Sequence, residues 1–447
     1  MDKWALTCQN DKAIGFDLVA IAERKVSGAA TGIATCLVEW TSLNQRTQVK
    51  PPREEKSAIV KVLVLTRSTG EGHNRVAAAM REAFQARGHE CDVWDALQIV
   101  GQDPKVPEVP VADGGKAHQH WVSDVSSHLY SWAVVKIPFM FGAVFNMGEV
   151  WCRTKVPSPV YIQNAKYADA TQDFIVDNEY DVVVSTHTFP VETLSAIRRK
   201  YAAAVRCYGI LTDYSYTPFF AEGDNDGFFI PHQDMMATCV KHRMPADRTY
   251  ALGLPVAEVF QHPMDKQAAR QQLGLPSDQP IYLLMAGGVG TPYTSQICDR
   301  LLSEGGESLY VTILTGRRED LFTAAARRYR DDPRVRVVPF TERVPAFMAA
   351  ADIMISKPGA VSSTEAATIG LPLVHTGAIP GSEVKNARFF ADRGMSLYNQ
   401  NPAEAARIAQ RLLHDPAGIA RMRDHQRRTV VPDAAQRIVA KIEEDCS

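Results

Sequence analysis

Residues 356–390 read SKPGAVSSTEAATIGLPLVHTGAIPGSEVKNARFF, and this is the most informative segment of the chain. The mostly apolar run 351–355 (ADIMI) predicts a short buried strand before it, and Pro358-Gly359 predicts a sharp turn. Three hydroxyl residues, Ser362, Ser363 and Thr364, then lead into a helical run. A strand that turns through glycine into a helix N-terminus is a candidate anion site, because free backbone N–H groups and the positive end of the helix dipole point at the ligand.

Acidic and amide side chains in the same segment indicate what the anion is attached to. Glu365 lies one turn inside the predicted helix and is suited to accept hydrogen bonds from a ribose diol. Glu383 follows Gly381 in a loop, and Asn386 stands three residues later. Together with Lys357 as a cation for phosphate, these groups predict a nucleotide-sugar site. Composition alone leaves a generic α/β loop with solvated charges as the alternative.

Composition bounds the class of protein. The chain has 447 residues, 45% hydrophobic and 22% charged, which predicts a globular protein of two or three domains. A net charge of −2 gives no overall field for nucleic acid, and we expect no nucleic-acid partner. The eight cysteines form no CxxC pair and are typical of a reducing compartment.

The sequence also bears on location. Apolar runs stay shorter than the roughly 18–20 residues of a spanning helix, and the N-terminus lacks an apolar signal core. We therefore expect a cytoplasmic protein that meets a membrane only peripherally, on its inner face.

Two series of short apolar runs predict two parallel sheets. The first series comprises residues 59–66, the run from Cys91 to Trp94, 181–185, 206–211 and 227–230. The second comprises residues 281–285, 310–314, 335–338, 352–355 and 372–375. Helical runs separate many of them, as in βαβ units, so we expect an α/β fold of two doubly wound domains that face each other across a cleft. The expected boundaries are an ill-defined extension over 1–57, domains over 58–255 and 256–402, and bracing helices over 403–447.

A second glycine-rich motif follows the first strand, where residues 69–74 read TGEGHN. Gly70 and Gly72 allow close approach of the backbone to a ligand. His73 lies above the carboxyl ends of the strands, where ligands of open α/β sheets bind, and its neutral-range pKa suits a general base. Spacing alone leaves a structural histidine as the alternative.

Other polar residues end predicted strands and are weaker candidates. Asp213 closes the strand ILTD, either to orient His73, to bind the acceptor, or to cap the next turn. His187 follows the strand over 181–185. In the second series, candidate donor contacts are Gly288 and Gly290 of a glycine-rich loop, Gly316 and Arg317 of a TGR element, and Phe340. Arg317 contacts a phosphate or is merely solvated, and Phe340 contacts the base or belongs to the core.

Residues 116–166 are the expected acceptor region. The candidate lipid contacts are Trp132, Phe139, Phe141, Phe145 and Trp151. Five basic against two acidic residues give this segment a charge of +3. Aromatic rings interleaved with cations are typical of a protein at an anionic membrane surface, although most apolar residues of such a segment belong to a core. No metal-ligand motif is present, and we expect neither a metal nor a cofactor.

Taken together, these motifs resemble those of glycosyltransferase family 28, in the branch of monogalactosyldiacylglycerol synthases and processive diacylglycerol glucosyltransferases. The resemblance covers roughly residues 58–400. It is carried by the GxGH loop at 70–73, the LTD element at 211–213, and the KPG turn at 357–359 with its following glutamate and PGxE loop.

The resemblance implies a GT-B fold and inverting, metal-independent transfer of glucose or galactose from a UDP-sugar to diacylglycerol. His73 is then the base, assisted by Asp213, and residues from Gly288 to Asn386 hold the donor. Glu71 and Ala360 depart from the family pattern, where small residues and glycine are usual. Three alternatives remain: a GlcNAc transferase of the lipid II type, a hexosamine epimerase of similar fold, and a UDP-sugar-binding sensor without turnover. The oligomeric state is not predicted.

Overall fold

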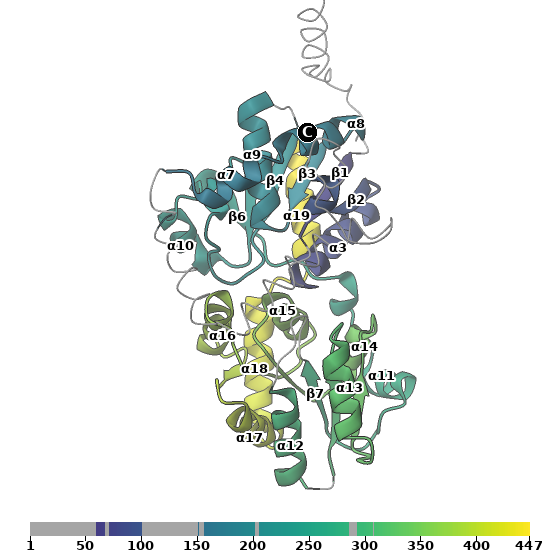
Figure 1. Cartoon of the computed structure of the whole chain (residues 1–447). Helices are drawn as coiled ribbons and strands as arrows, with labels where there is room; N and C mark the ends of the chain where they lie inside the picture. Colours follow the sequence, from purple (N-terminus) through teal and green to yellow (C-terminus); the bar gives the residue numbers. More distant parts are fainter. Residues whose placement is uncertain are drawn as a thin grey trace, which may run out of the picture. The chain divides into compact units, whose positions relative to one another are not determined.

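The computed structural model describes residues 60–67, 71–100, 151, 156–201, 205–285, 293–306 and 308–447. Two six-stranded sheets form its framework, and every strand pair in them is parallel (Figure 1). This confirms the predicted fold class of two doubly wound halves.

The first sheet has the order β2-β1-β3-β4-β5-β6. Its strands are β1 (Lys61–Thr66), β2 (Glu90–Asp95), β3 (Val182–Ser185), β4 (Arg206–Ile210), β5 (Gly227–Ile230) and β6 (Thr249–Ala251). The second sheet has the order β12-β11-β10-β7-β8-β9. Its strands are β7 (Ile281–Met285), β8 (Tyr310–Leu314), β9 (Val335–Val338), β10 (Ile353–Ser356), β11 (Leu373–His375) and β12 (Leu397–Tyr398). The sequence missed β6 and β12, which are too short to show a periodic pattern.

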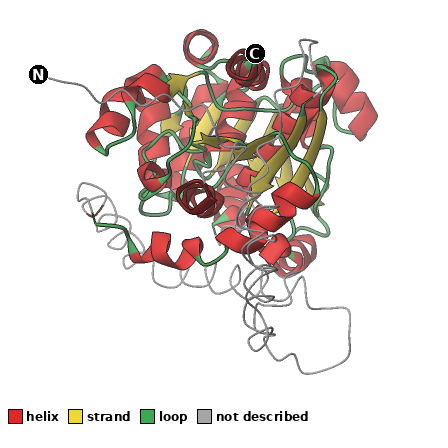
Figure 2. Cartoon of the chain, turned by 90° about the horizontal axis from the view of Figure 1, so that it is seen from above, coloured by secondary structure: helices red, strands yellow, loops and turns green. Residues whose placement is uncertain are grey.

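Helices cover both faces of the strands (Figure 2). Those of the first half are α3 (Glu71–Ala86), α4 (Ala96–Val100), α7 (Pro159–Ala165), α8 (Ala168–Asp177), α9 (Thr188–Tyr201) and α10 (Met236–Lys241). Those of the second half are α11 (Lys266–Leu273), α12 (Thr294–Glu304), α13 (Glu319–Arg328), α14 (Val344–Ala350), α15 (Ala360–Thr368), α16 (Ser382–Asp392), α17 (Pro402–Leu413) and α18 (Pro416–Thr429). The final helix is α19 (Ala434–Cys446).

Burial on both faces explains why the strands read as unbroken apolar runs. In β1, Val62 and Val64 belong to one hydrophobic cluster, whereas Leu63 and Leu65 belong to another on the opposite face. The cluster that holds Val62 also contains Leu283 of β7. The two sheets therefore share one continuous core.

The C-terminal residues connect the two halves. α17 packs on β10 and β11, and α18 packs on α15, whereas α19 packs on α3 of the first half (Figure 1). Glu443 of α19 accepts hydrogen bonds from Arg87 Nε at 2.9 Å and lies 2.8 Å from His89 Nε2. The sequence predicted a pair of helices here, and the structure has three.

Each sheet reverses its strand order at one point. In the first sheet the chain runs from β1 to β2 and then places β3 on the other side of β1. In the second sheet β8 and β9 lie on one side of β7, and β10 lies on the other. The loops that leave the carboxyl ends of the two strands diverge at such a point, which makes it the usual ligand site of doubly wound sheets. The residues that follow β1, β3, β7 and β10 are thus the ones placed to bind ligands.

Candidate active site

His73 lies at the reversal point of the first sheet. It is in the first turn of α3, directly above β1, and its Nδ1 lies 2.7 Å from the carbonyl oxygen of Thr186, which follows β3. The hydroxyl of Thr212 lies 3.1 Å from the same nitrogen. A carbonyl oxygen only accepts, so Nδ1 must carry the hydrogen and Nε2 keeps its lone pair. The ring is held in the tautomer that a general base needs.

A second imidazole packs against His73. The ring of His187 meets it edge to face, with 4.6 Å between centroids. His187 Nδ1 accepts the backbone N–H of Phe189 at 3.1 Å. Burial lowers the pKa of both histidines, and the charge of His73 lowers the pKa of His187 further. The pair is therefore neutral near pH 7.

Asp213 is an acid close enough to His73 for its charge to act on the ring. Burial raises the pKa of Asp213, while hydrogen bonding from Asn386 and the charge of His73 act against the rise. In turn, the charge of Asp213 raises the pKa of His73 against the effect of burial. The hydrogen bonds that orient His73 come from Thr186 and Thr212, so Asp213 acts on the ring through space.

Asn386 of α16 joins the loops of the two sheets. Its Nδ2 donates to Asp213 Oδ1 at 2.8 Å and to the carbonyl of Pro358 at 3.3 Å. Its Oδ1 accepts the backbone N–H of Tyr214 at 2.8 Å. The side chain is fully buried. The sequence analysis placed Asn386 among the residues that hold the donor, but here both ends of its amide are occupied by protein groups.

The helix start after β10 has the geometry expected of an anion site. Gly359 is the N-cap of α15, and the first N–H groups of a helix have no intrahelical acceptor. The partly exposed Ser362 hydroxyl donates to the Gly359 carbonyl at 3.2 Å. Ser363 and Thr364 are buried: the first contacts His375 Nε2 at 2.9 Å and the second contacts the Tyr214 hydroxyl at 2.9 Å. Helix geometry therefore directs these two predicted donor contacts into the core.

Glu365, the predicted ribose acceptor, is paired with an arginine from the other half. Arg75 Nη1 donates to Glu365 Oε2 at 2.6 Å. Glu365 is only 2% exposed, and burial raises its pKa to about 7, with Arg75 acting against that rise.

Lys357 and Glu383 form a second ion pair at the reversal point of the second sheet. Lys357 Nζ lies 2.6 Å from Glu383 Oε1, and Glu383 Oε2 accepts the backbone N–H of Ile379 at 3.0 Å. Gly381 precedes α16 with φ 115°, a conformation that favours glycine. Glu383 thus fixes the ammonium of Lys357 beside the first turn of α16.

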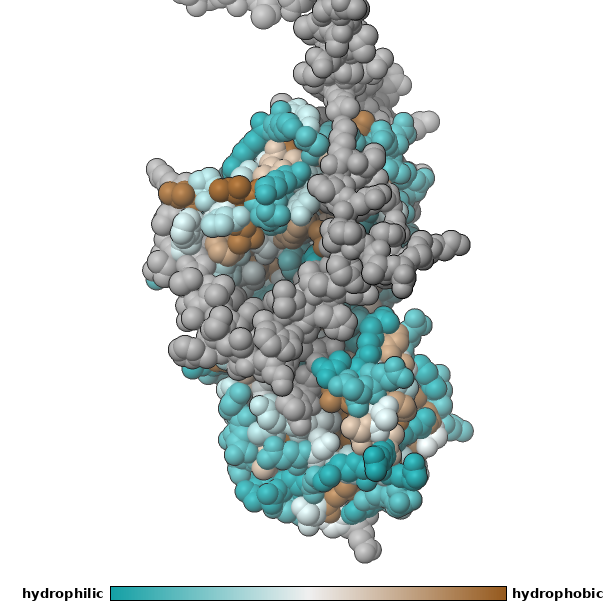
Figure 3. Space-filling model, viewed as in Figure 1, coloured by the Kyte–Doolittle hydropathy of each residue, from teal (hydrophilic) through white to brown (hydrophobic). Residues whose placement is uncertain are grey.

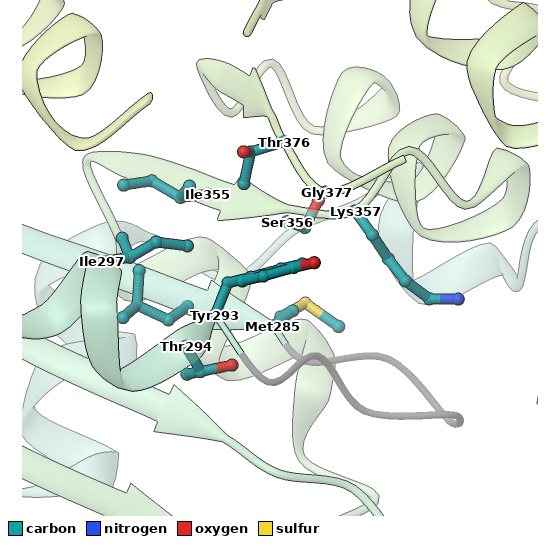
Figure 4. A pocket seen from close by; sticks show the side chains of 10 residues that line it. Met285, Tyr293, Thr294, Ile297, Ile355, Ser356, Lys357, Thr376 and Gly377 are labelled. Atoms are coloured by element: carbon teal, nitrogen blue, oxygen red, sulfur yellow. The ribbon is translucent and has the colours of Figure 1, made fainter. Parts of the chain in front are cut away.

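A small pocket opens beside these residues (Figure 4). Met285 at the end of β7 and Ser356 and Lys357 at the end of β10 line it, together with Thr376 and Tyr293. The Tyr293 ring extends across the pocket, and the Lys357 side chain points outward from it (Figure 4). The pocket therefore lies at the reversal point of the second sheet.

Arg317 and Phe340 lie together at the surface. The Arg317 guanidinium is 3.8 Å from the centre of the Phe340 ring, and its Nε donates to Glu71 Oε1 at 2.7 Å. Phe340 is 43% exposed, which excludes its alternative interpretation as a core aromatic. Gly316 has φ 64°, which lets the chain turn sharply before Arg317.

Several predicted site residues lie outside the described residues: Gly70, Gly288, Gly290, Trp132, Phe139, Phe141 and Phe145. Gly72 lies in the first turn of α3, and a Cβ there would lie 3.5 Å from Val361 of α15. Trp151 is 40% exposed, and its indole N–H donates to the carbonyl of Val156 at 3.1 Å.

Sequence reasoning missed Arg75, Tyr293 and the roles of Thr186 and Thr212. Arg75 follows His73 by two residues at a strand-to-helix junction, and its charge there was a usable signal. A backbone carbonyl such as that of Thr186 carries no sequence signal.

The described part of the chain contains no group of three or more His, Cys, Asp or Glu side chains arranged to hold a metal ion. Within the same residues, every helix is too short or too polar to cross a membrane. Cys91, Cys207, Cys239 and Cys298 are free and buried, as expected of small core residues, whereas Cys446 is exposed.

Curated relatives match most of the chain. A processive diacylglycerol beta-glucosyltransferase of Bacillus licheniformis is 23% identical over 386 residues, which is 85% of this chain and 94% of the relative. An enzyme of the same name from Bacillus cytotoxicus is 23% identical over 394 residues, covering 86% and 94%.

Solved structures share the fold at low identity. MurG of Acinetobacter baumannii is 16% identical, with a TM-score of 0.55 over 86% of this chain and 99% of that one. A UDP-GlcNAc 2-epimerase of Neisseria meningitidis bound to UDP-GlcNAc is 11% identical, with a TM-score of 0.56 over 86% and 100%. These neighbours support the GT-B architecture.

Two family models match in succession. The model of monogalactosyldiacylglycerol (MGDG) synthase matches residues 73–256, beginning at His73, and the C-terminal domain model of glycosyltransferase family 28 matches residues 290–438. Between them they cover most of the candidate residues, from His73 to Asp213 in the first half and from Arg317 to Asn386 in the second. The chain belongs to glycosyltransferase family 28, with a first half of the MGDG synthase type.

Proposed function

We propose that this glycosyltransferase moves a hexose, glucose or galactose, from a UDP-sugar to diacylglycerol, with inversion at the sugar and without a metal ion. The observation that carries the proposal is the His73 ring, whose Nδ1 is bound to the Thr186 carbonyl so that Nε2 can take a proton. The names of the curated relatives support the choice of diacylglycerol as acceptor.

The reaction is a single displacement. His73 Nε2 takes the proton of the lipid hydroxyl as its oxygen attacks C1 of the sugar. The bond between C1 and the diphosphate oxygen breaks, and UDP leaves with the electron pair. Attack opposite the leaving group inverts the configuration at C1. The lowered pKa of His73 keeps the base neutral at physiological pH.

The negative charge that develops on the departing diphosphate must be stabilised. The open N–H groups at the start of α15 and the Lys357 ammonium, held by Glu383, would supply it. Glu365 would accept hydrogen bonds from the ribose hydroxyls. Arg317 and Phe340, which lie together at the surface, would contact the outer part of the nucleotide.

The acceptor is a membrane lipid, so the enzyme must reach a bilayer surface. Around α7 several apolar side chains are exposed, among them Val156 at 59% and Ile162 at 58% (Figure 3). Lys166 and Arg199 lie beside them, with the Arg199 guanidinium 5.1 Å from the centre of the Tyr161 ring. Apolar residues flanked by cations fit the interface of an anionic membrane, and we assign this patch to peripheral attachment.

The first experiment measures transfer directly. Purified full-length protein is incubated with radiolabelled UDP-glucose or UDP-galactose, with and without diacylglycerol vesicles, and label is counted in the organic phase. Diacylglycerol-dependent label establishes the function and names the sugar. An arm with UDP-GlcNAc and a polyprenyl acceptor tests the lipid II alternative. UDP-sugar binding without any product in all arms would favour the sensor.

Membrane attachment is tested separately by sedimentation with phosphatidylglycerol vesicles. We expect Ile162→Asp to reduce the bound fraction. Val259→Asp, at an exposed valine outside the patch, should leave it unchanged. Equal binding by all three proteins would contradict the assignment of this surface.

A further inference from the structure

We propose that Arg75, on the helix that carries His73, is a positioning residue for the donor: it holds Glu365 as a carboxylate that accepts the ribose hydroxyls of UDP. This inference builds on the proposed function. It adds that the donor site is complete only while the His73 helix lies against α15.

The contact between the two helices is close and shielded. α3 packs against α15, and Arg75 Nη1 lies 2.6 Å from Glu365 Oε2. The Glu365 side chain is 3% exposed and that of Arg75 is 32% exposed. Among the described residues, Arg75 is the one hydrogen-bond partner of this carboxylate, which leaves Oε1 to accept from a ligand.

Burial makes the charge of Glu365 depend on Arg75. Removing a carboxylate from water favours its neutral form, and burial raises the pKa of Glu365 to about 7 even with Arg75 opposing the rise. Without Arg75 the acid would be neutral at physiological pH. A neutral carboxyl has one hydroxyl that donates, so it cannot accept from both hydroxyls of a ribose with equal effect.

A second ion pair from the same helix provides an internal contrast. Glu71 lies one turn before Arg75 and also reaches the second half, where it pairs with Arg317 at 2.7 Å. The Arg317 side chain is 62% exposed and that of Glu71 is 35% exposed, so water screens this pair. Both pairs join the same two halves. Only the Arg75–Glu365 pair is shielded enough from water for the arginine to control the charge of the glutamate.

The test measures UDP affinity of the full-length protein by calorimetry between pH 6 and 9. Against wild type, we expect Arg75→Ala to weaken UDP binding about tenfold near pH 7, the size of one charged hydrogen bond. Affinity should recover as the pH rises, because Glu365 then ionises without help. Arg75→Lys should restore part of the affinity, since it retains the cation.

Three controls isolate the mechanism. Glu365→Gln should weaken UDP binding independently of pH. Adding Arg75→Ala to this variant should weaken UDP binding no further. Glu71→Gln, which breaks the matched exposed pair, should change UDP affinity by less than about fivefold, because water screens that pair. A UDP analogue without the 2′ and 3′ hydroxyls should bind the wild type and Arg75→Ala equally, because it offers Glu365 nothing to accept.

The outcomes separate this inference from the proposed function. Wild type that binds no UDP overturns both. Wild type that binds UDP, with Arg75→Ala equal to it at every pH, overturns the role of Arg75 alone. Equal weakening for UDP and its dideoxy analogue in both Arg75 variants would mean a general structural defect, and would also overturn the role.

Discussion

The two reversal points are built alike and do different chemistry. In each, a buried parallel strand turns into a helix at the carboxyl edge of its sheet: β1 into α3 and β10 into α15. In the first, side chains and carbonyls close around His73 and leave one imidazole nitrogen for a proton. In the second, Lys357, Pro358 and Gly359 lead into the helix, and its N-cap makes no side-chain hydrogen bond.

The difference shows how one local structure serves catalysis and binding. Burial acts on a titratable group in both places, but in opposite directions. It lowers the pKa of His73 and raises that of Glu365, because the charged form is the disfavoured one in each case. The histidine needs no partner to stay neutral, whereas the glutamate needs Arg75 to stay charged. The neutral state of His73 therefore depends only on groups of its own half. The charged state of Glu365 depends on Arg75 from the other half.

The largest effect should come from breaking the first site. We expect His73→Ala to reduce kcat for lipid glycosylation by about two to four orders of magnitude, because the proton acceptor is lost. UDP affinity should stay near wild type, since the donor residues are untouched. His262→Ala, at an exposed histidine, serves as the control. Near-full turnover in His73→Ala would refute the assignment of the base.

Breaking the connection between the sites should have the next largest effect. Asn386→Ala would remove a bridge whose amide serves Asp213 and the Tyr214 N–H, leaving buried polar groups unpaired. We expect a loss of about 1–3 kcal/mol in the free energy of unfolding. Urea unfolding measures this loss, and kcat/KM should fall in the same variant. Unchanged stability would show that the bridge is dispensable.

The pH dependence of turnover should report the protonation of His73. Transfer requires neutral His73, and burial keeps the pKa of His73 below its ordinary value of 6.5. At saturating UDP-sugar, where donor binding no longer limits the rate, kcat should therefore stay constant as the pH is lowered past 6.5 and fall only at lower pH. Asp213 raises the pKa of His73, so Asp213→Asn should move this acid limb to lower pH. The pH profiles of kcat at saturating UDP-sugar in the two proteins check the sign. A shift to higher pH would contradict the through-space role of Asp213.

The smallest effect should come from the exposed pair. Glu71→Gln removes a solvent-screened contact with Arg317, worth at most about 1 kcal/mol, so kcat/KM should change by less than about fivefold. Steady-state kinetics at two salt concentrations measure this change in kcat/KM. A change as large as that of Arg75→Ala would show that exposure does not separate the two pairs.

Much of this site was open to prediction from the sequence. The KPG turn, the glutamate after it and the histidine after the first strand each follow a strand directly, and that local order places them at a sheet edge. Contacts between segments that are distant in the chain could not be predicted in this way. The sequence placed Ser363 and Thr364 at the ligand, and only the packing of α15 shows them turned into the core.

By itself the sequence determined two parallel sheets, most of their strands and the polar residues that end them, because burial on both faces and turn chemistry are local patterns. The tertiary structure decided the strand order, and with it which strand ends meet. It also decided that Thr186 orients His73, that Asn386 joins the halves, and that Glu365 is buried against Arg75. The reason is physical: hydrogen bonds and desolvation depend on neighbours far away in the chain, and no local pattern encodes them.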